Sequence, residues 1–113
     1  MTTTETETLT SARALVDASS SVIDAALSHA AEVTGGGRGV DEHQVHVERL
    51  AYLMTELRAA AELVAYVERH AADGTADALT ESEALVYAAE TAHHLRTTVD
   101  AAPDDFGIGD VAA

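Results

Sequence analysis

Histidines and carboxylates are the residues of this chain whose types and spacing could do chemistry. Six histidines occur among 113 residues. Glu90 and His93, three positions apart, would share one helical face, as the carboxylate and imidazole ligands of di-iron bundles do. Glu42 and His46, four positions apart, would also share a face. Because a closed metal site needs several convergent ligands, we interpret these side chains as exposed and keep a metal-binding bundle as an alternative.

The same histidines could respond to pH. His43, His46, His93 and His94 belong to the only side-chain type that ordinarily titrates at about pH 6–7. The acidic charge of the chain favours their protonated forms. Sensing of pH is therefore a second interpretation of the histidines.

The remaining motifs indicate structure rather than catalysis. Ser19-Ser20-Ser21 lies inside a helical pattern and lacks the strained turn of a nucleophilic serine. The stretch Gly35–Gly39 has no lysine and no preceding strand, so we interpret it as a connector and not as a phosphate loop. Cysteine is absent, which excludes disulfides and thiolate sites. We predict no catalytic residue.

Charge excludes several classes of partner. The chain has 6 basic and 20 acidic residues and a net charge of −14. Such a field repels phosphate, so we expect neither nucleic acid nor an anionic membrane as a partner. The first eight residues have no basic start, and no apolar run approaches the roughly 20 residues that cross a bilayer. We expect a cytoplasmic protein.

Apolar residues spaced by three and four predict the first of three helices, from about Leu9 to Val33. Its stripe consists of Leu9, Ala12, Val16, Ser19, Ile23, Ala26, Ala30 and Val33. The glycines that follow should end it, since glycine readily adopts positive φ.

Two capping boxes predict where the other helices begin. Asp41 with Gln44 would start the second helix, which should end near Asp73-Gly74. Thr80 with Glu83 would start the third helix, and Pro103 would end it. The second stripe is Val47, Leu50, Met54, Leu57, Ala61 and Val64, widened by Leu53, Ala60, Leu63 and Val67. The third stripe is Leu85, Ala88, Ala92, Leu95 and Val99.

These elements predict an all-α, up-down bundle of three long helices that resembles a four-helix bundle and is completed by association. We expect a disordered tail at 1–8, a helical bundle domain at 9–103 and a C-terminal loop at 104–113. The second helix has a face too broad for two neighbours, so Leu53, Leu63 and Val67 should remain uncovered within the chain. A second copy or a larger partner would then cover them.

One stretch of the second helix carries a family resemblance. Gln44 begins a helix of apolar residues with a Thr-Glu and an Ala-Ala, up to Ala60. This stretch resembles the C-terminal helical domain of acyl-CoA dehydrogenases. Residues 80–99 are similar to the next helix of that domain, and residues 104–107 stand where the family has a Gly-Gly-aromatic-Gly turn.

The flavin motifs of the family are degenerate in this chain. The arginine and phenylalanine that help hold the flavin correspond to Val33 and Gly36, and neither supplies a cation or a ring. The paired glycines correspond to Asp104 and Asp105, which would repel a diphosphate. We therefore expect the chain alone to bind no cofactor and to lack catalysis.

The resemblance implies two functions. The first is a non-catalytic small subunit or association module that forms a homodimer or joins a larger flavoenzyme subunit. The alternative is an enzyme subunit, of the acyl-CoA dehydrogenase type of oxidoreductase, that completes a flavin and acyl-CoA site at a heteromeric interface. Gln44, Arg38 and Phe106 would then contribute to binding FAD.

Overall fold

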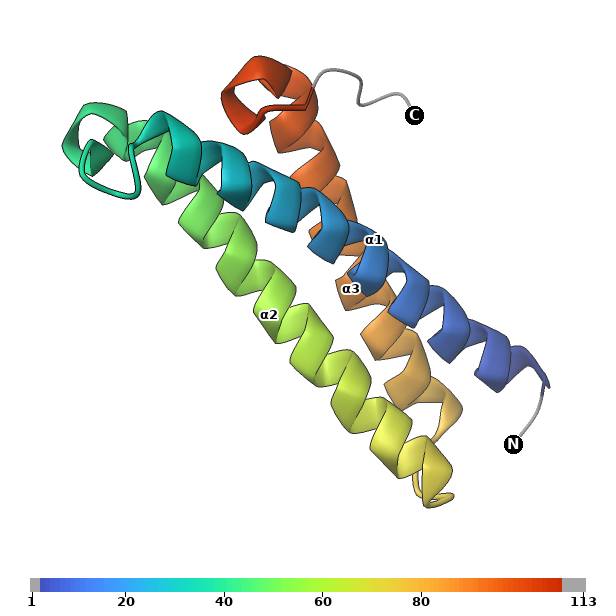
Figure 1. The fold of residues 1–113 in the computed structure, drawn as a ribbon. Helices are drawn as coiled ribbons and strands as arrows, with labels where there is room; N and C mark the ends of the chain where they lie inside the picture. The colour runs from blue at the N-terminus through green and yellow to red at the C-terminus, as the bar shows by residue number, and fades with distance from the viewer. Residues whose placement is uncertain (1–2, 109–113) are drawn as a thin grey trace.

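Three α-helices and two short 3₁₀ turns make up the computed structural model, which describes residues 3–108 and their side chains from residue 7 onward (Figure 1). In chain order they are α1 (Thr3–Val33), η1 (Val40–His43), α2 (Gln44–Ala72), α3 (Ala78–Ala101) and η2 (Pro103–Phe106). Each helix packs against the other two, and α2 runs antiparallel to α1 and α3. The prediction of an all-α bundle of three long helices is confirmed.

The stripe predicted for α1 forms its buried face. Every member of that stripe except Val33 is buried, including Ser19. Val33 is exposed, and Thr34 is buried instead.

The two ends of the chain differ from the predicted tails. Helix α1 begins at Thr3, so it includes residues 3–8, which the sequence assigned to a disordered tail. Within the segment predicted as a C-terminal loop, residues 104–106 belong to the turn η2. The rest of these two predictions, at residues 1–2 and 109–113, lies outside the described residues.

The glycines end α1 as predicted, and Thr34, for which no role was predicted, takes part in the turn. The Thr34 hydroxyl donates to the carbonyl of Ala30 at 2.7 Å and accepts from the N–H of Gly37 at 3.1 Å. Gly35, Gly36 and Gly37 have φ values of 62°, 78° and 99°. These values lie in the left-handed region, where a side chain would be strained, so this sequence of glycines is needed for the turn.

The start predicted for α2 was wrong. Asp41 does not cap the helix but lies within the 3₁₀ turn η1, and α2 begins at Gln44. His43 holds the N-cap position without a side-chain hydrogen bond. The Gln44 amide donates to the Asp41 carboxylate at 3.4 Å, so the two side chains interact without forming a capping box.

The buried face of α2 is rotated from the predicted main stripe. The buried residues are Leu50, Leu53, Leu57, Ala60, Val64 and Val67. Met54 is exposed, while Ala61 and Leu63 are partly buried. Because Leu53 and Val67 are buried within the chain itself, the uncovered strip predicted on α2 does not exist in this form.

The N-cap of α3 lies three residues before the predicted one. Asp77 is the cap, and its carboxylate accepts from the Thr80 N–H at 2.8 Å and from the Thr80 hydroxyl at 2.6 Å. Thr80 is therefore the third helical residue, and the box with Glu83 was wrong. The buried face contains Glu81, Ala84, Ala88, Thr91, Leu95 and Val99, so Leu85 and Ala92 lie at its edge.

Polar pairs between helices fix their relative positions. The Arg13 guanidinium of α1 donates to both Glu68 oxygens of α2, at 3.2 and 2.6 Å. The hydrogen bond with Glu68 raises the pKa of Arg13. His94 of α3 lies 2.8 Å from the Glu56 carboxylate of α2.

No helix among residues 3–108 is long and apolar enough to cross a membrane.

Candidate functional site

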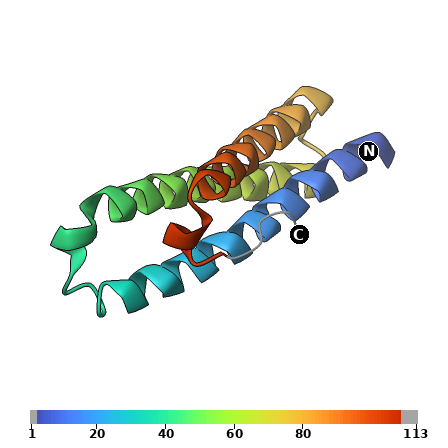
Figure 2. The ribbon, with the colours of Figure 1, turned by 90° about the horizontal axis from the view of Figure 1, so that it is seen from above.

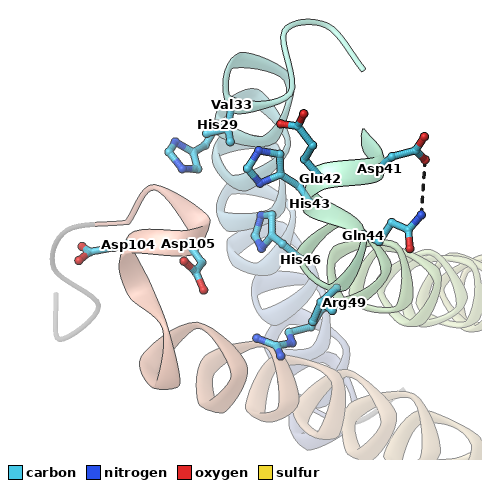
Figure 3. A pocket seen from close by; sticks show the side chains of 11 residues that line it. His29, Val33, Asp41, Glu42, His43, Gln44, His46, Arg49, Asp104 and Asp105 are labelled. Carbon is cyan, nitrogen blue, oxygen red and sulfur yellow. Dashed lines mark hydrogen bonds between the residues drawn. The ribbon is translucent and has the colours of Figure 1, made fainter. Parts of the chain in front are cut away.

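An open cleft of about 640 Å³ lies at the end of the bundle where η1, η2 and the C-terminal half of α1 meet. His29 comes from α1, His43 from η1 and His46 from the first turn of α2. Asp104 and Asp105 of η2 also line the cleft, although the Asp104 side chain points away from the histidines (Figure 3). The cleft therefore joins η2 to the segments on either side of the glycine connector, which are distant from it in the sequence, and η2 reaches the cleft by folding back onto α1 (Figure 2).

His46 has the most constrained position in the cleft. Its ring packs edge-on against Phe106, with 4.8 Å between ring centroids and an interplanar angle of 64°. Both ring nitrogens are buried and have no hydrogen-bond partner among the described residues. Burial lowers the pKa of His46. Asp105 acts in the opposite direction, whereas His29, Arg49 and His43 lower the pKa further.

Carboxylates dominate the charge of the cleft. Among the described residues, its lining includes four acidic ones, Asp41, Glu42, Asp104 and Asp105, but only one arginine, Arg49. At neutral pH the cleft is therefore negative and disfavours an anion such as a flavin diphosphate.

The three residues proposed to contribute to a flavin site do not converge. Gln44 lines the cleft, where its amide is bonded to Asp41. Arg38 is exposed in the glycine connector and donates to the Gly35 carbonyl at 3.1 Å. Phe106 is 0% exposed, so its ring is not available to stack on a ligand in this conformation.

The candidate metal ligands are divided between two places. Glu42 and His46 line the cleft, whereas Glu90 and His93 lie exposed on α3. In the described part of the chain, no group of three or more histidine, aspartate or glutamate side chains is placed to hold a metal ion. The two pairs therefore do not form one di-iron type of site.

Several cleft residues were missed from the sequence. His29 lies within the α1 pattern and is distant in sequence from His46, and nothing in the spacing connects the two. Arg49 looks like an ordinary polar residue of α2. The signal that could have located the cleft is Phe106, since a single phenylalanine in a polar C-terminal segment indicates an anchor for that segment.

A second feature is the outer face of α3. Leu79, Val86 and Tyr87 are 69%, 56% and 36% exposed. They surround a shallow hollow of about 310 Å³ together with Ser82, Glu83 and Glu90. We call these six residues the α3 outer face. Tyr52 and Tyr66 are also exposed, on α2.

Comparisons with known proteins do not assign the chain to a family. No family model, no curated protein and no solved structure matches it. The resemblance to acyl-CoA dehydrogenases thus stays a prediction from the sequence.

Proposed function

We propose that this protein is a non-catalytic helical association module that binds a partner protein through the α3 outer face. The observation that carries the proposal is the exposure of Leu79, Val86 and Tyr87 around one hollow. Large apolar side chains gathered at one place on a surface are typical of an interaction site. The opposite face of α3 is already packed in the core, so this face is free to receive a further helix.

The chemistry of the face defines its partner. Leu79 and Val86 are seven residues apart, so they lie on one side of α3, and such apolar side chains accept the apolar stripe of another helix. Glu83 and Glu90 line the same hollow and are exposed. A partner helix with apolar anchors and flanking lysines or arginines would complement both features. It would also complete a four-helix arrangement.

The charge of the chain favours such a partner over a second copy. Two copies would bring their Glu83 and Glu90 carboxylates together, and each would carry a net charge of −14. The sequence resemblance implies that the partner is a larger acyl-CoA dehydrogenase-type flavoenzyme subunit. Completion of a flavin site receives less support, because Phe106 is buried and the cleft that contains Gln44 is negative.

Site-specific photocross-linking tests the proposal. A photoreactive phenylalanine analogue replaces Val86 on the α3 outer face, or Asp24 on α1 as the control, in the organism that makes the protein. We expect position 86 to cross-link one partner protein, and mass spectrometry to place the cross-link in a helix with basic flanks. Leu79→Glu puts a charge among the apolar anchors, and the cross-link yield should fall about tenfold or more.

The controls separate this proposal from its alternatives. A cross-link of the chain to itself would replace the partner by a second copy. Equal cross-linking from positions 24 and 86, or a yield unchanged by Leu79→Glu, would contradict a specific site on α3. Flavin absorbance in the purified complex that disappears with Gln44→Ala would favour the enzyme subunit instead.

A further inference from the structure

The 3₁₀ turn η2 is fixed to the bundle by one aromatic anchor. Phe106, the only phenylalanine of the chain, is completely buried and belongs to the hydrophobic core. Its ring contacts the edge of His46 at the start of α2. The turn also packs against α1 and the end of α3. The segment thus lies beside α1 beyond the end of α3 (Figure 2).

Packing rather than hydrogen bonding holds η2 in place. In the described part of the chain, the hydrogen bonds of η2 are local: Asp105 N–H to Ala102 O, Gly107 N–H to Asp104 O and Ile108 N–H to Pro103 O, at 3.1, 3.2 and 3.0 Å. A second histidine, His29, also packs against this segment. Gly107 lies so close to the His29 ring that an added Cβ would come within 2.5 Å of its Cγ.

We propose that Pro103–Phe106 is an acid-released clasp, which stays closed while His46 is neutral and opens when His46 takes up a proton. As a neutral ring, His46 acts as an apolar surface for Phe106. As an imidazolium it carries two N–H donors, and both nitrogens are shielded from solvent without an acceptor among the described residues. A buried charge without partners is costly, and opening of the clasp would return both donors to water.

The other charged groups that shift the His46 pKa do not cancel the effect of burial, which disfavours a protonated His46 in the closed state. Asp105 of η2 attracts the protonated ring, but burial has the larger effect on the His46 pKa. His29 of α1, His43 of η1 and Arg49 of α2 all oppose a positive charge at His46. These three basic groups therefore act together with burial. Glu42 of η1 and Asp104 of η2 also line the cleft, but they are not among the residues that shift the His46 pKa. Among the described residues that shift the His46 pKa, only Asp105 on the clasp favours the charged ring.

The direction of the pH effect follows from the lowered pKa. In the open state His46 regains its ordinary pKa of 6.5. Closure is therefore fully favoured above about pH 6.5 and weakens as the pH falls towards the lower pKa of the closed state. Within that window the population of the open state rises by up to about tenfold per pH unit, because one proton is taken up.

The single phenylalanine allows a direct test. Protein labelled with 4-fluorophenylalanine gives one ¹⁹F NMR signal, from position 106. We expect the signal of the buried ring at about pH 7.5 to be replaced towards pH 5 by that of a solvated ring, with unchanged helical circular dichroism. Hydrogen exchange of the Ile108 amide should accelerate over the same range after correction for intrinsic rates, while that of Val64 in the core should not.

Matched histidine variants identify the proton acceptor. His46→Gln and His46→Leu should remove the pH dependence of both readouts, whereas His43→Gln, in the same cleft, should retain it. If either His46→Gln or His46→Leu does not fold, the other variant still provides the test. A clasp that stays closed through the titration of His46, that closes more tightly in acid, or that opens only with global unfolding would overturn the proposal.

Discussion

Leu57 shows how strongly one side chain contributes to this bundle. It is 8% exposed in the middle of α2 and belongs to the core that α2 shares with α1 and α3, whereas Met54 one turn earlier is 37% exposed. Truncation of a buried leucine costs about 2–5 kcal/mol, and a domain of this size has only about 5–15 kcal/mol of stability. A cavity at Leu57 therefore removes a large part of the stability.

We predict that Leu57→Ala lowers the melting temperature by about 8 °C or more, given about 4–8 °C per kcal/mol for a small domain. Met54→Ala removes a side chain of similar size from the edge of the face and should cost much less. Thermal denaturation followed by circular dichroism measures both variants. Equal decreases in melting temperature would mean that Met54 contributes to the core as much as Leu57 does, as the stripe predicted from the sequence implied.

The difference between Leu57 and Met54 shows how much of the buried face can be predicted from the spacing of apolar residues. The α1 stripe was predicted almost completely, because more than half of the α1 residues outside the stripe are polar. In α2 apolar and alanine residues occupy most positions from Leu50 to Val67, so two neighbouring faces both satisfy the helical spacing. Which face is buried depends on where α1 and α3 lie, and that information is absent from the spacing within α2.

At the scale of elements, Asp77 determines where α3 begins. Its carboxylate accepts from the Thr80 N–H and hydroxyl, and these hydrogen bonds lower the pKa of Asp77. The sequence pattern predicted Thr80 with Glu83 as the cap instead. Asp77 takes this position because its backbone is extended, with φ of −116° and ψ of 171°, so that Ala78 and Leu79 join the helix.

We predict that Asp77→Ala destabilises the protein, whereas Glu83→Ala leaves its melting temperature nearly unchanged. Asp77→Asn should retain part of the cap, since an amide oxygen still accepts from the backbone. Melting curves of the three variants at neutral pH test this. A larger loss for Glu83→Ala would restore the capping box predicted from the sequence.

The same cap should respond to acid. Because the folded state lowers the Asp77 pKa, the stability that the charged carboxylate contributes is complete above its ordinary pKa of 3.8 and is lost as the pH falls through the lowered value. The uncharged amide of Asp77→Asn does not titrate. The difference in melting temperature between the wild-type protein and this variant should therefore shrink in acid, and a difference that stayed constant would contradict a charge-assisted cap.

At the scale of the whole molecule, the candidate site could not be predicted. The spacing of Glu42, Gln44 and His46 places them near one helix end, but the cleft exists only because η2 folds back to it. The position of η2 depends on the packing of Phe106 into the core that α1, α2 and α3 form. This is a tertiary contact, which the local sequence pattern does not predict. The α3 outer face was missed for a related reason, since Leu79 and Val86 lie outside the stripe that the sequence assigned to the core.

The net charge of −14 acts on the whole molecule and leads to the last prediction. At 0.01 M ionic strength charges interact over about 30 Å, a distance that spans most of a bundle whose principal extents are 50 × 27 × 16 Å. At 1 M salt screens these interactions beyond about 3 Å, so that only groups in contact still interact. Repulsion among carboxylates favours the expanded, unfolded chain. We therefore expect the melting temperature to rise by several degrees between these two salt concentrations.

Charge variants separate this repulsion from a general salt effect. Asp24 and Glu32 are exposed on α1, so Asp24→Asn with Glu32→Gln should raise the melting temperature in low salt and change it little in high salt. Glu68→Gln also removes a negative charge but breaks the contact with Arg13, where the two side chains approach to 2.6 Å. It should lower the melting temperature in low salt. If all three substitutions raised it equally, the distribution of charge would be irrelevant and the Arg13–Glu68 pair would contribute nothing to the bundle.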